Sequence, residues 1–218
     1  MELYSKDQYL TGITRIGVIA IVAMVILLSV AIILPHLAAG HRRESRIGCV
    51  NCIRQIELAF KTWAVDNNDR FPMTVPSSEG GSMESVMTGN PTRTFSVMSN
   101  EISAPKLVVC PQDTERKGAP SFGEFRVENV SYFVGVDVTQ TNPAAFFIGD
   151  RNLSLNDIPV KPGLFSFTTN SAIGWTEEMH VHHGNIGMVD GSVQQMSIDY
   201  LRDISQFTGF ATNRLAVP

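Results

Sequence analysis

Three cysteines are the first residues whose spacing could do chemistry. Cys49 and Cys52 form a C-x-x-C pair, and Cys110 precedes Pro111. Such a pair can bind a metal or exchange disulfides when it opens a helix, because the exposed backbone N–H groups there lower a thiol pKa. Here the pair lies inside a helical pattern that starts several residues earlier. The simpler prediction is that both cysteines are buried on the apolar side of that helix.

Three histidines cluster near the C-terminus and suggest a zinc site. The candidate ligands are His180, His182 and His183, together with Glu177, Glu178 or Asp190. His180 and His182 would share one face of a strand, but the tight H-E-x-x-H spacing is missing. The simpler prediction is that His180 packs or hydrogen-bonds near the Asp190-Gly191 turn while the other two are solvated.

Two acidic motifs offer further candidates. Asp150 and Arg151 follow a strand-like run, and we expect a buried ion pair that organises loops rather than a catalytic carboxylate. The Asp66-Asn67-Asn68-Asp69 cluster carries oxygen ligands that calcium prefers, although it lacks the EF-hand pattern and is also explained by helix termination. No G-x-S-x-G or glycine-rich phosphate loop is present. We therefore expect a protein that is not an enzyme, with calcium as its only candidate cofactor.

The elements that position these residues belong to an acidic chain. The 218 residues include 17 Lys and Arg against 21 Asp and Glu, for a net charge of -4. A protein that wraps nucleic acid is usually basic, so no nucleic-acid partner is expected. The mean hydropathy of +0.05 hides an uneven distribution. Residues 1–40 carry two basic and two acidic side chains, so the whole net charge belongs to residues 41–218.

The apolar part of the chain is the stretch Ile16–Leu34, in which only Gly17 and Ser29 are not hydrophobic. About 20 such residues in a helix cross a membrane, and Pro35 is expected to end or kink that helix. We predict a transmembrane helix over residues 13–40. A buried core helix and a secretory signal cleaved near residues 38–40 are the alternatives.

Beyond this span, an apolar stripe at helical spacing predicts an amphipathic stem over residues 41–66. The stripe consists of Cys49, Cys52, Ile53, Ile56, Phe60 and Trp63, whereas Arg46, Arg54, Glu57 and Lys61 lie off it. Residues 67–218 are expected to form a globular, β-rich domain. Short helices are expected near Met83–Met87, Phe95–Ile102 and Ile198–Phe207. Strands are expected at Lys106–Cys110, Val130–Val138, Ala144–Gly149, Leu164–Thr168, Asn185–Val189 and Ser192–Ser197.

The last two expected strands are joined by a two-residue hairpin signal, in which Gly191 supplies a positive φ. A long N-terminal helix followed by a mostly antiparallel sheet is an α+β arrangement.

This order of elements resembles the type IV pilin and type II secretion pseudopilin superfamily, and the resemblance covers nearly the whole chain. His180, nine residues and then Asp190-Gly191 match a C-terminal motif of pilin-like proteins with a prepilin-type N-terminal segment. Asn185 lies within that motif. Four other stretches that look like the group are CVNCIRQIELAFKTWAVDNNDRFP, LVVCPQD, SYFVGVD and GDRN.

The resemblance implies a leader-like segment over residues 1–12 and a processing site at Gly12-Ile13. It also implies a disulfide between Cys49 and Cys110, which would leave Cys52 as a spare thiol and require an oxidising compartment. Gly17, Ala20, Ala23 and Ser29 offer small residues for helix packing in lipid. The sequence departs from the group at one point, because no Asp or Glu lies between Gly12 and Arg42. The group's assembly glutamate is therefore missing.

The orientation of the span has two conflicting indications. Lys6 and Arg15 precede it, and Arg42, Arg43 and Arg46 follow it, so the positive-inside count alone places the C-terminal part in the cytoplasm. The cysteines and the resemblance favour a periplasmic domain anchored in a bacterial inner membrane, or an extracellular one in a filament.

Three functional hypotheses result. The first is a pilin-like subunit that assembles through its helix with like subunits and with secretion or pilus machinery. The second is an uncleaved, anchored periplasmic binding or adaptor module that does not polymerise. The third and most remote is a metal-dependent enzyme centred on the histidine cluster and Asp190.

Overall fold

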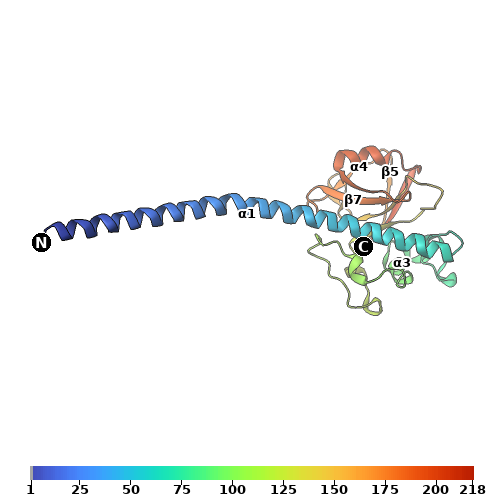
Figure 1. Cartoon of the computed structure of the whole chain (residues 1–218). Helices are drawn as coiled ribbons and strands as arrows, with labels where there is room; N and C mark the ends of the chain where they lie inside the picture. The colour runs from blue at the N-terminus through green and yellow to red at the C-terminus, as the bar shows by residue number, and fades with distance from the viewer. Residues whose placement is uncertain (1) are drawn as a thin grey trace. The chain divides into compact units, whose positions relative to one another are not determined.

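The fold was obtained as a computed structural model that describes the backbone of residues 2–218 and the side chains of residues 17–34 and 47–218. The chain divides into two compact units, residues 1–44 and 45–218. Helix α1 (Glu2–Asp66) supplies the first unit and opens the second (Figure 1). Of the two expectations for Pro35, an end or a kink of the helix, the end is wrong, because α1 continues through this residue. The proline removes one backbone donor, and the flanking turns maintain the helix.

The part of α1 in the second unit carries the predicted apolar stripe. Cys49, Ile53, Ile56 and Phe60 are fully buried, and Cys52 is half-buried. Glu57 was expected off the stripe, yet it is only 3% exposed. It lies four residues after Ile53, which places it on the same helix face.

The second unit is an α+β domain built on a six-stranded, fully antiparallel sheet, as the sequence predicts. The strand order is β5-β9-β1-β2-β7-β8, and a separate three-stranded sheet has the order β4-β3-β6. The strands are β1 (Tyr132–Gly135), β2 (Phe146–Asp150), β3 (Leu153–Leu155), β4 (Ile158–Pro159), β5 (Gly163–Thr168), β6 (Ile173–Trp175), β7 (His183–Met188), β8 (Val193–Ser197) and β9 (Thr212–Val217).

Several strands differ from the sequence-based expectation. The run Lys106–Cys110 is not a strand, since it forms the 3-10 helix η3 (Pro105–Val108) and then extended chain. Pro105 fits the first turn of such a helix because it needs no N–H partner there. Strand β9 was not predicted, although it pairs with both β1 and β5. The three strands of the smaller sheet, β3, β4 and β6, were not predicted either.

Short helices complete the domain. They are α2 (Met83–Met87), α3 (Thr92–Val97) and α4 (Ile198–Ser205), with 3-10 turns η1 (Pro72–Thr74), η2 (Ser77–Glu79), η4 (Phe122–Glu124) and η5 (Val127–Asn129). Helix α2 has the predicted bounds, and α4 ends two residues sooner than expected. Helix α3 begins three residues earlier and ends five residues earlier than the predicted Phe95–Ile102. The Ser197 hydroxyl accepts from the backbone N–H of Tyr200 and so caps α4.

Two hydrophobic clusters hold these elements together. In the first, α1 packs against one face of the sheet and against the segment of residues 71–130; in Figure 1 this segment, with α3, lies on the other side of α1 from β5, β7 and α4. The second lies on the opposite sheet face and includes Trp175 and Leu201. Alternation along β1 divides its side chains between the two, with Tyr132 in the first and Phe133 in the second.

Candidate functional site

A fully buried polar cluster lies where β2 ends beside β7. Asp150 is the last residue of β2, Asn185 lies in β7, and His180 precedes that strand. Asp150 Oδ2 accepts from the Asn185 backbone N–H at 2.6 Å and from its side-chain Nδ2 at 2.8 Å. His180 Nε2 lies 3.3 Å from the same oxygen. Three of the predicted motif residues therefore meet around one carboxylate oxygen.

The cluster also reaches the disulfide. Cys49 and Cys110 are bonded, as the resemblance implied, and Cys110 Sγ lies 3.4 Å from His180 Nε2. The bond joins α1 to the chain that follows η3, across 61 residues of sequence. Closing a loop of this length stabilises a fold by about 4 kcal/mol in the chain-entropy treatment.

The geometry does not form a nucleophile–histidine–carboxylate relay. In such a relay the sulfur and the carboxylate contact opposite ring nitrogens, whereas here both lie near Nε2 of His180. His180 Nδ1 and Asp150 Oδ1 have no hydrogen-bond partner among the described residues. Because His180 and Asp150 are at most 1% exposed, a substrate cannot reach them without opening the domain.

The third cysteine lies at the edge of this cluster. Burial raises the pKa of the Cys52 thiol, and the nearby Asp150 charge raises it further, while contact with Tyr132 lowers it in part. The pKa of Tyr132 is also well above its ordinary value, mainly through complete burial. A thiol held in its protonated form is a poor nucleophile, so Cys52 does not readily attack the neighbouring disulfide.

Asp150 and Arg151 were expected to pair with each other, and this expectation is wrong. Their side chains belong to consecutive residues at a strand end and point to different partners. Arg151 instead forms a bidentate bond with Asp113, at 2.8 Å from Nε to Oδ2 and 3.0 Å from Nη2 to Oδ1. Glu115 and Glu178 complete this ion-pair cluster.

The Arg151–Asp113 pair shifts both pKa values. Burial alone would lower the pKa of Arg151, but the hydrogen bonds and charge of Asp113 outweigh it and raise the pKa. Burial likewise opposes ionisation of Asp113, yet the bonds from Arg151 and Ser131 lower its pKa overall. Both groups stay charged, and the pair fixes the loop after β2 against the loop after Cys110, which is the loop-organising role expected of Arg151. No pattern in the sequence pointed to Asp113 as its partner.

The His180-to-Asp190 motif is split between two places. Asp190 and Gly191 lie in the β7–β8 hairpin, where Gly191 has φ +90° as predicted. The Gly191 N–H donates to the Met188 carbonyl, and the Ser192 N–H donates to Asp190 Oδ1. Four residues, 189–192, therefore lie between the two strands rather than the predicted two. His180 lies against Asp150 rather than at this hairpin.

The other histidines do not join a metal cluster. His182 is exposed, and it lies with Val181 in left-handed backbone before β7 begins at His183, so His180 and His182 do not share a strand face. Within the described residues, the one gathering of three His, Cys, Asp or Glu ligand atoms is Cys49, Cys110 and His180.

Glu57 is a buried acidic residue, although the helical pattern placed it off the apolar stripe. Burial raises its pKa from 4.5 to about 8, Lys61 and Arg54 oppose the rise, and Asp190 adds to it. Its Oε1 has no hydrogen-bond partner in the described part of the chain. The carboxyl fits because Gly187 in β7 has no side chain at that point. The signal available in the sequence was its i, i+4 spacing from Ile53.

The Asp66–Asp69 cluster ends α1 by ordinary helix-stop chemistry. Asn68 and Asp69 adopt left-handed backbone, and the Asp69 N–H donates to the Ala64 carbonyl. The Asn67 side chain donates to the Trp63 carbonyl at 2.8 Å. Calcium binding at this turn stays a prediction.

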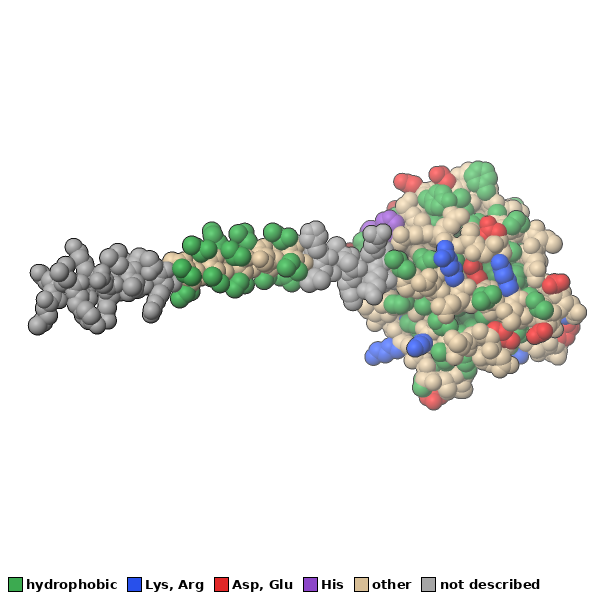
Figure 2. Space-filling view, in the orientation of Figure 1, with side chains coloured by type: hydrophobic (Ala, Val, Ile, Leu, Met, Phe, Trp, Pro, Cys, Tyr) green, Lys and Arg blue, Asp and Glu red, His purple; other side chains and the backbone are tan. Residues whose placement is uncertain are grey.

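The apolar stretch of α1 is one helical segment, Gly17–Leu34, that is long and apolar enough to cross a membrane, and a signal sequence has the same character. Its side chains are exposed all round, including those at Gly17, Ala20, Ala23 and Ser29, and Figure 2 shows no charged side chain among them. The Ser29 hydroxyl donates to the Val25 carbonyl at 2.7 Å, so it leaves no unpaired donor. Gly12 and Ile13 lie outside the residues whose side chains are described.

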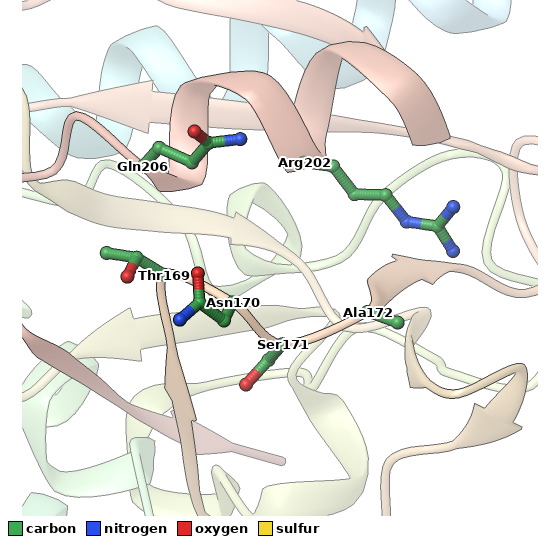
Figure 3. Close-up of a pocket in the computed structure, with 6 residues that line it drawn as sticks. All are labelled: Thr169, Asn170, Ser171, Ala172, Arg202 and Gln206. Carbon is green, nitrogen blue, oxygen red and sulfur yellow. The ribbon is translucent and has the colours of Figure 1, made fainter.

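A shallow recess of about 340 Å³ lies between α4 and the β5–β6 loop (Figure 3). Thr169, Asn170, Ser171 and Ala172 line it from the loop, and Arg202 and Gln206 line it from α4. Arg202 Nε is committed to the Ile173 carbonyl, and Ser171 Oγ accepts from the Thr168 N–H. The Arg202 bond ties α4 to β6, and the Ser171 bond closes the loop on itself.

No protein-family model matches the chain, and neither the characterised proteins nor the solved structures contain a significant match.

Proposed function

We propose that this chain is a pilin-like envelope protein, anchored in a bacterial inner membrane by residues 17–34 and assembling through that helix with like subunits. The observation that carries the proposal is the change of character along α1. Its exposed part, Gly17–Leu34, is apolar all round, whereas its later part buries one face in the α+β domain. A helix suited to lipid at one end and to a protein core at the other is what a pilin-like subunit requires.

The buried disulfide supports an extracytoplasmic domain. Disulfides persist in oxidising compartments and are rare in the cytosol. Cys49 and Cys110 are both fully buried and bonded, which fits a domain that matures in the periplasm. This orientation is opposite to the one favoured by the flanking arginines.

Two engineered cysteines test assembly in native membranes. Ile19→Cys and Ile32→Cys lie in the exposed apolar helix, and Cys52→Ser removes the free thiol while leaving the disulfide intact. Because each subunit then carries two reactive thiols, an assembled array gives a ladder of cross-linked species after oxidation. A matched chain with two exposed cysteines at Ile158 and Phe207 of the domain is the control. Monomer alone in the helix variant would contradict assembly.

A monomeric anchored module is the second candidate, favoured by the absence of any acidic residue between Gly12 and Arg42. The mature N-terminus in native membranes separates the two. A chain that starts at Ile13 with an N-methylated amine supports a processed pilin-like subunit, and an intact Met1 supports a fixed anchor. Labelling of Ile158→Cys by a membrane-impermeant maleimide in intact spheroplasts tests the orientation in either case.

A further inference from the structure

We propose that Cys49, Cys110 and His180 form a zinc site when the two cysteines are reduced, and that the disulfide is the closed form of this site. This inference goes beyond the proposed function and does not depend on membrane anchoring or assembly. The three ligand atoms all lie within 4.8 Å of one another, and all three residues are buried.

The separations fit a tetrahedral metal after one bond opens. With Zn–S near 2.3 Å and Zn–N near 2.0 Å, a sulfur and a nitrogen on the same ion lie about 3.5 Å apart. Cys110 Sγ and His180 Nε2 are 3.4 Å apart. Reduction frees Cys49 Sγ to rotate away from Cys110 Sγ, toward the roughly 3.7 Å that two thiolates on one zinc require.

The surroundings support the imidazole as a ligand. A histidine that binds metal through Nε2 carries its proton on Nδ1 and usually donates it to a second group. No described residue accepts from His180 Nδ1, so the ligand assignment rests on the position of Nε2 beside the two sulfurs. Asp150 Oδ2 keeps both bonds from Asn185 when Nε2 turns its lone pair to a metal, so that oxygen stays paired. The Asp150 charge next to the site also favours a cation.

The reaction balances without a group from the domain. A phosphine reductant takes up an oxygen from water and delivers two electrons to the S–S bond, and the two water protons go to the sulfurs. Zinc then binds two thiolates, and two protons leave to solvent. Two sulfurs joined in a disulfide cannot also bind zinc as thiolates. Two-electron oxidation of the zinc-bound thiolates to the disulfide must therefore release the metal.

The test uses the full-length protein in detergent, reduced anaerobically with a phosphine and then exposed to zinc chloride. We expect about one zinc per chain after desalting, and only background zinc in the oxidised protein. Cobalt chloride in place of zinc should give the near-ultraviolet thiolate-to-cobalt absorption. Reduced protein that retains no zinc would overturn the proposal.

Variants identify the ligands. His180→Asn should weaken zinc binding at least about tenfold, while His182→Asn, an exposed neighbour, should leave it unchanged. Cys52→Ser should also bind as the wild type does, because Cys52 is outside the three-ligand set. Unchanged binding in His180→Asn, or lost binding in Cys52→Ser, would refute the assignment.

A measurement on the wild type keeps the test decisive if His180→Asn does not fold. Zinc should slow alkylation of Cys49 and Cys110 by iodoacetamide in the reduced protein, and it should not slow alkylation of Cys52. Peptide mass spectrometry reads all three sites at once. Equal rates with and without zinc at Cys49 and Cys110 would contradict the site.

Discussion

The two described parts of helix α1 share one backbone geometry and have opposite surroundings. Along Gly17–Leu34 every side chain is exposed and none is charged. Along residues 47–66 one face is buried against the sheet, while Leu58 and Val65 on other faces remain exposed. Helical structure is therefore common to both, and only the arrangement of apolar side chains differs.

The difference shows for which part of a helix the surroundings can be inferred from the sequence alone. An all-round apolar segment of this length has the composition of a membrane anchor or of a signal sequence. An amphipathic segment identifies a buried face but not what covers it. For residues 47–66 the covering elements are β1, β2, β7 and the segment of residues 71–130. The three strands come from far along the chain, although the segment begins soon after α1 ends.

The largest effect is expected where the buried face is densest. Phe60→Ala removes a ring that lies 4.5 Å from that of Phe147 and 6.2 Å from that of Phe71. We expect a loss of about 4 kcal/mol in the free energy of unfolding, since the cavity adds to the lost transfer energy. Thermal denaturation in detergent measures it. Leu58→Ala, at 65% exposure, is the matched control and should cost little.

A charge in the other part of the helix should act on the membrane instead. Ile26→Arg places a guanidinium where the side chain is 57% exposed and has no charged neighbour in the described helix. The insertion cost is about 3 kcal/mol, so recovery in carbonate-washed membranes should fall sharply while the domain melts as before. Leu58→Arg should leave recovery unchanged. A lower melting temperature with normal recovery would mean that this stretch is a core helix.

Much of the fold could be predicted from local patterns. The stripe, helix α2 and most strands of the large sheet have periodicities or turn residues that mark them. Strand β9 lacked such a signal, because its sequence TNRLAV does not alternate apolar and polar residues. Its strand character comes from pairing with β1 and β5. At Lys106–Cys110 the β-branched residues suggested a strand, but Pro105 and the disulfide favour a tight turn.

The sequence predicted which residues belong to the site but not which of them contact one another. His180, Asn185 and Asp150 were singled out from motifs, yet sequence spacing tied His180 to Asp190, whereas strand pairing of β2 with β7 brings it to Asp150. Glu57 was placed off the apolar stripe and Asp113 was given no role, because a single acidic residue looks solvated until its partners are known. The type of each side chain can be read from the sequence, but its neighbours in space depend on how distant segments pair.

Glu57 is a carboxyl group on the otherwise apolar buried face of residues 47–66. Replacing it with a neutral side chain should increase the stability of the domain at alkaline pH. A folded pKa raised from 4.5 to about 8 means that stability is fully present below about pH 4.5 and is lost as pH rises through 8. Glu57→Gln should therefore be more stable than the wild type by on the order of 2 kcal/mol at pH 8.5. Near pH 4.5 the two should converge. Urea denaturation across this range measures the difference, with exposed Glu124→Gln as the control.

The smallest effect on stability is expected from a substitution in β7, the strand that faces the Glu57 carboxyl. A Cβ at residue 187 would overlap Glu57 Oε1 and lie 2.9 Å from Ile53 Cγ2. Because the carboxyl is the end of a flexible side chain, we expect Gly187→Ala to cost about 1 kcal/mol. In a Glu57→Ala background most of that cost should disappear, and a double-mutant cycle measures the coupling. Additive effects would mean that Ile53 alone sets the need for glycine, and that Glu57 is merely tolerated in the buried face.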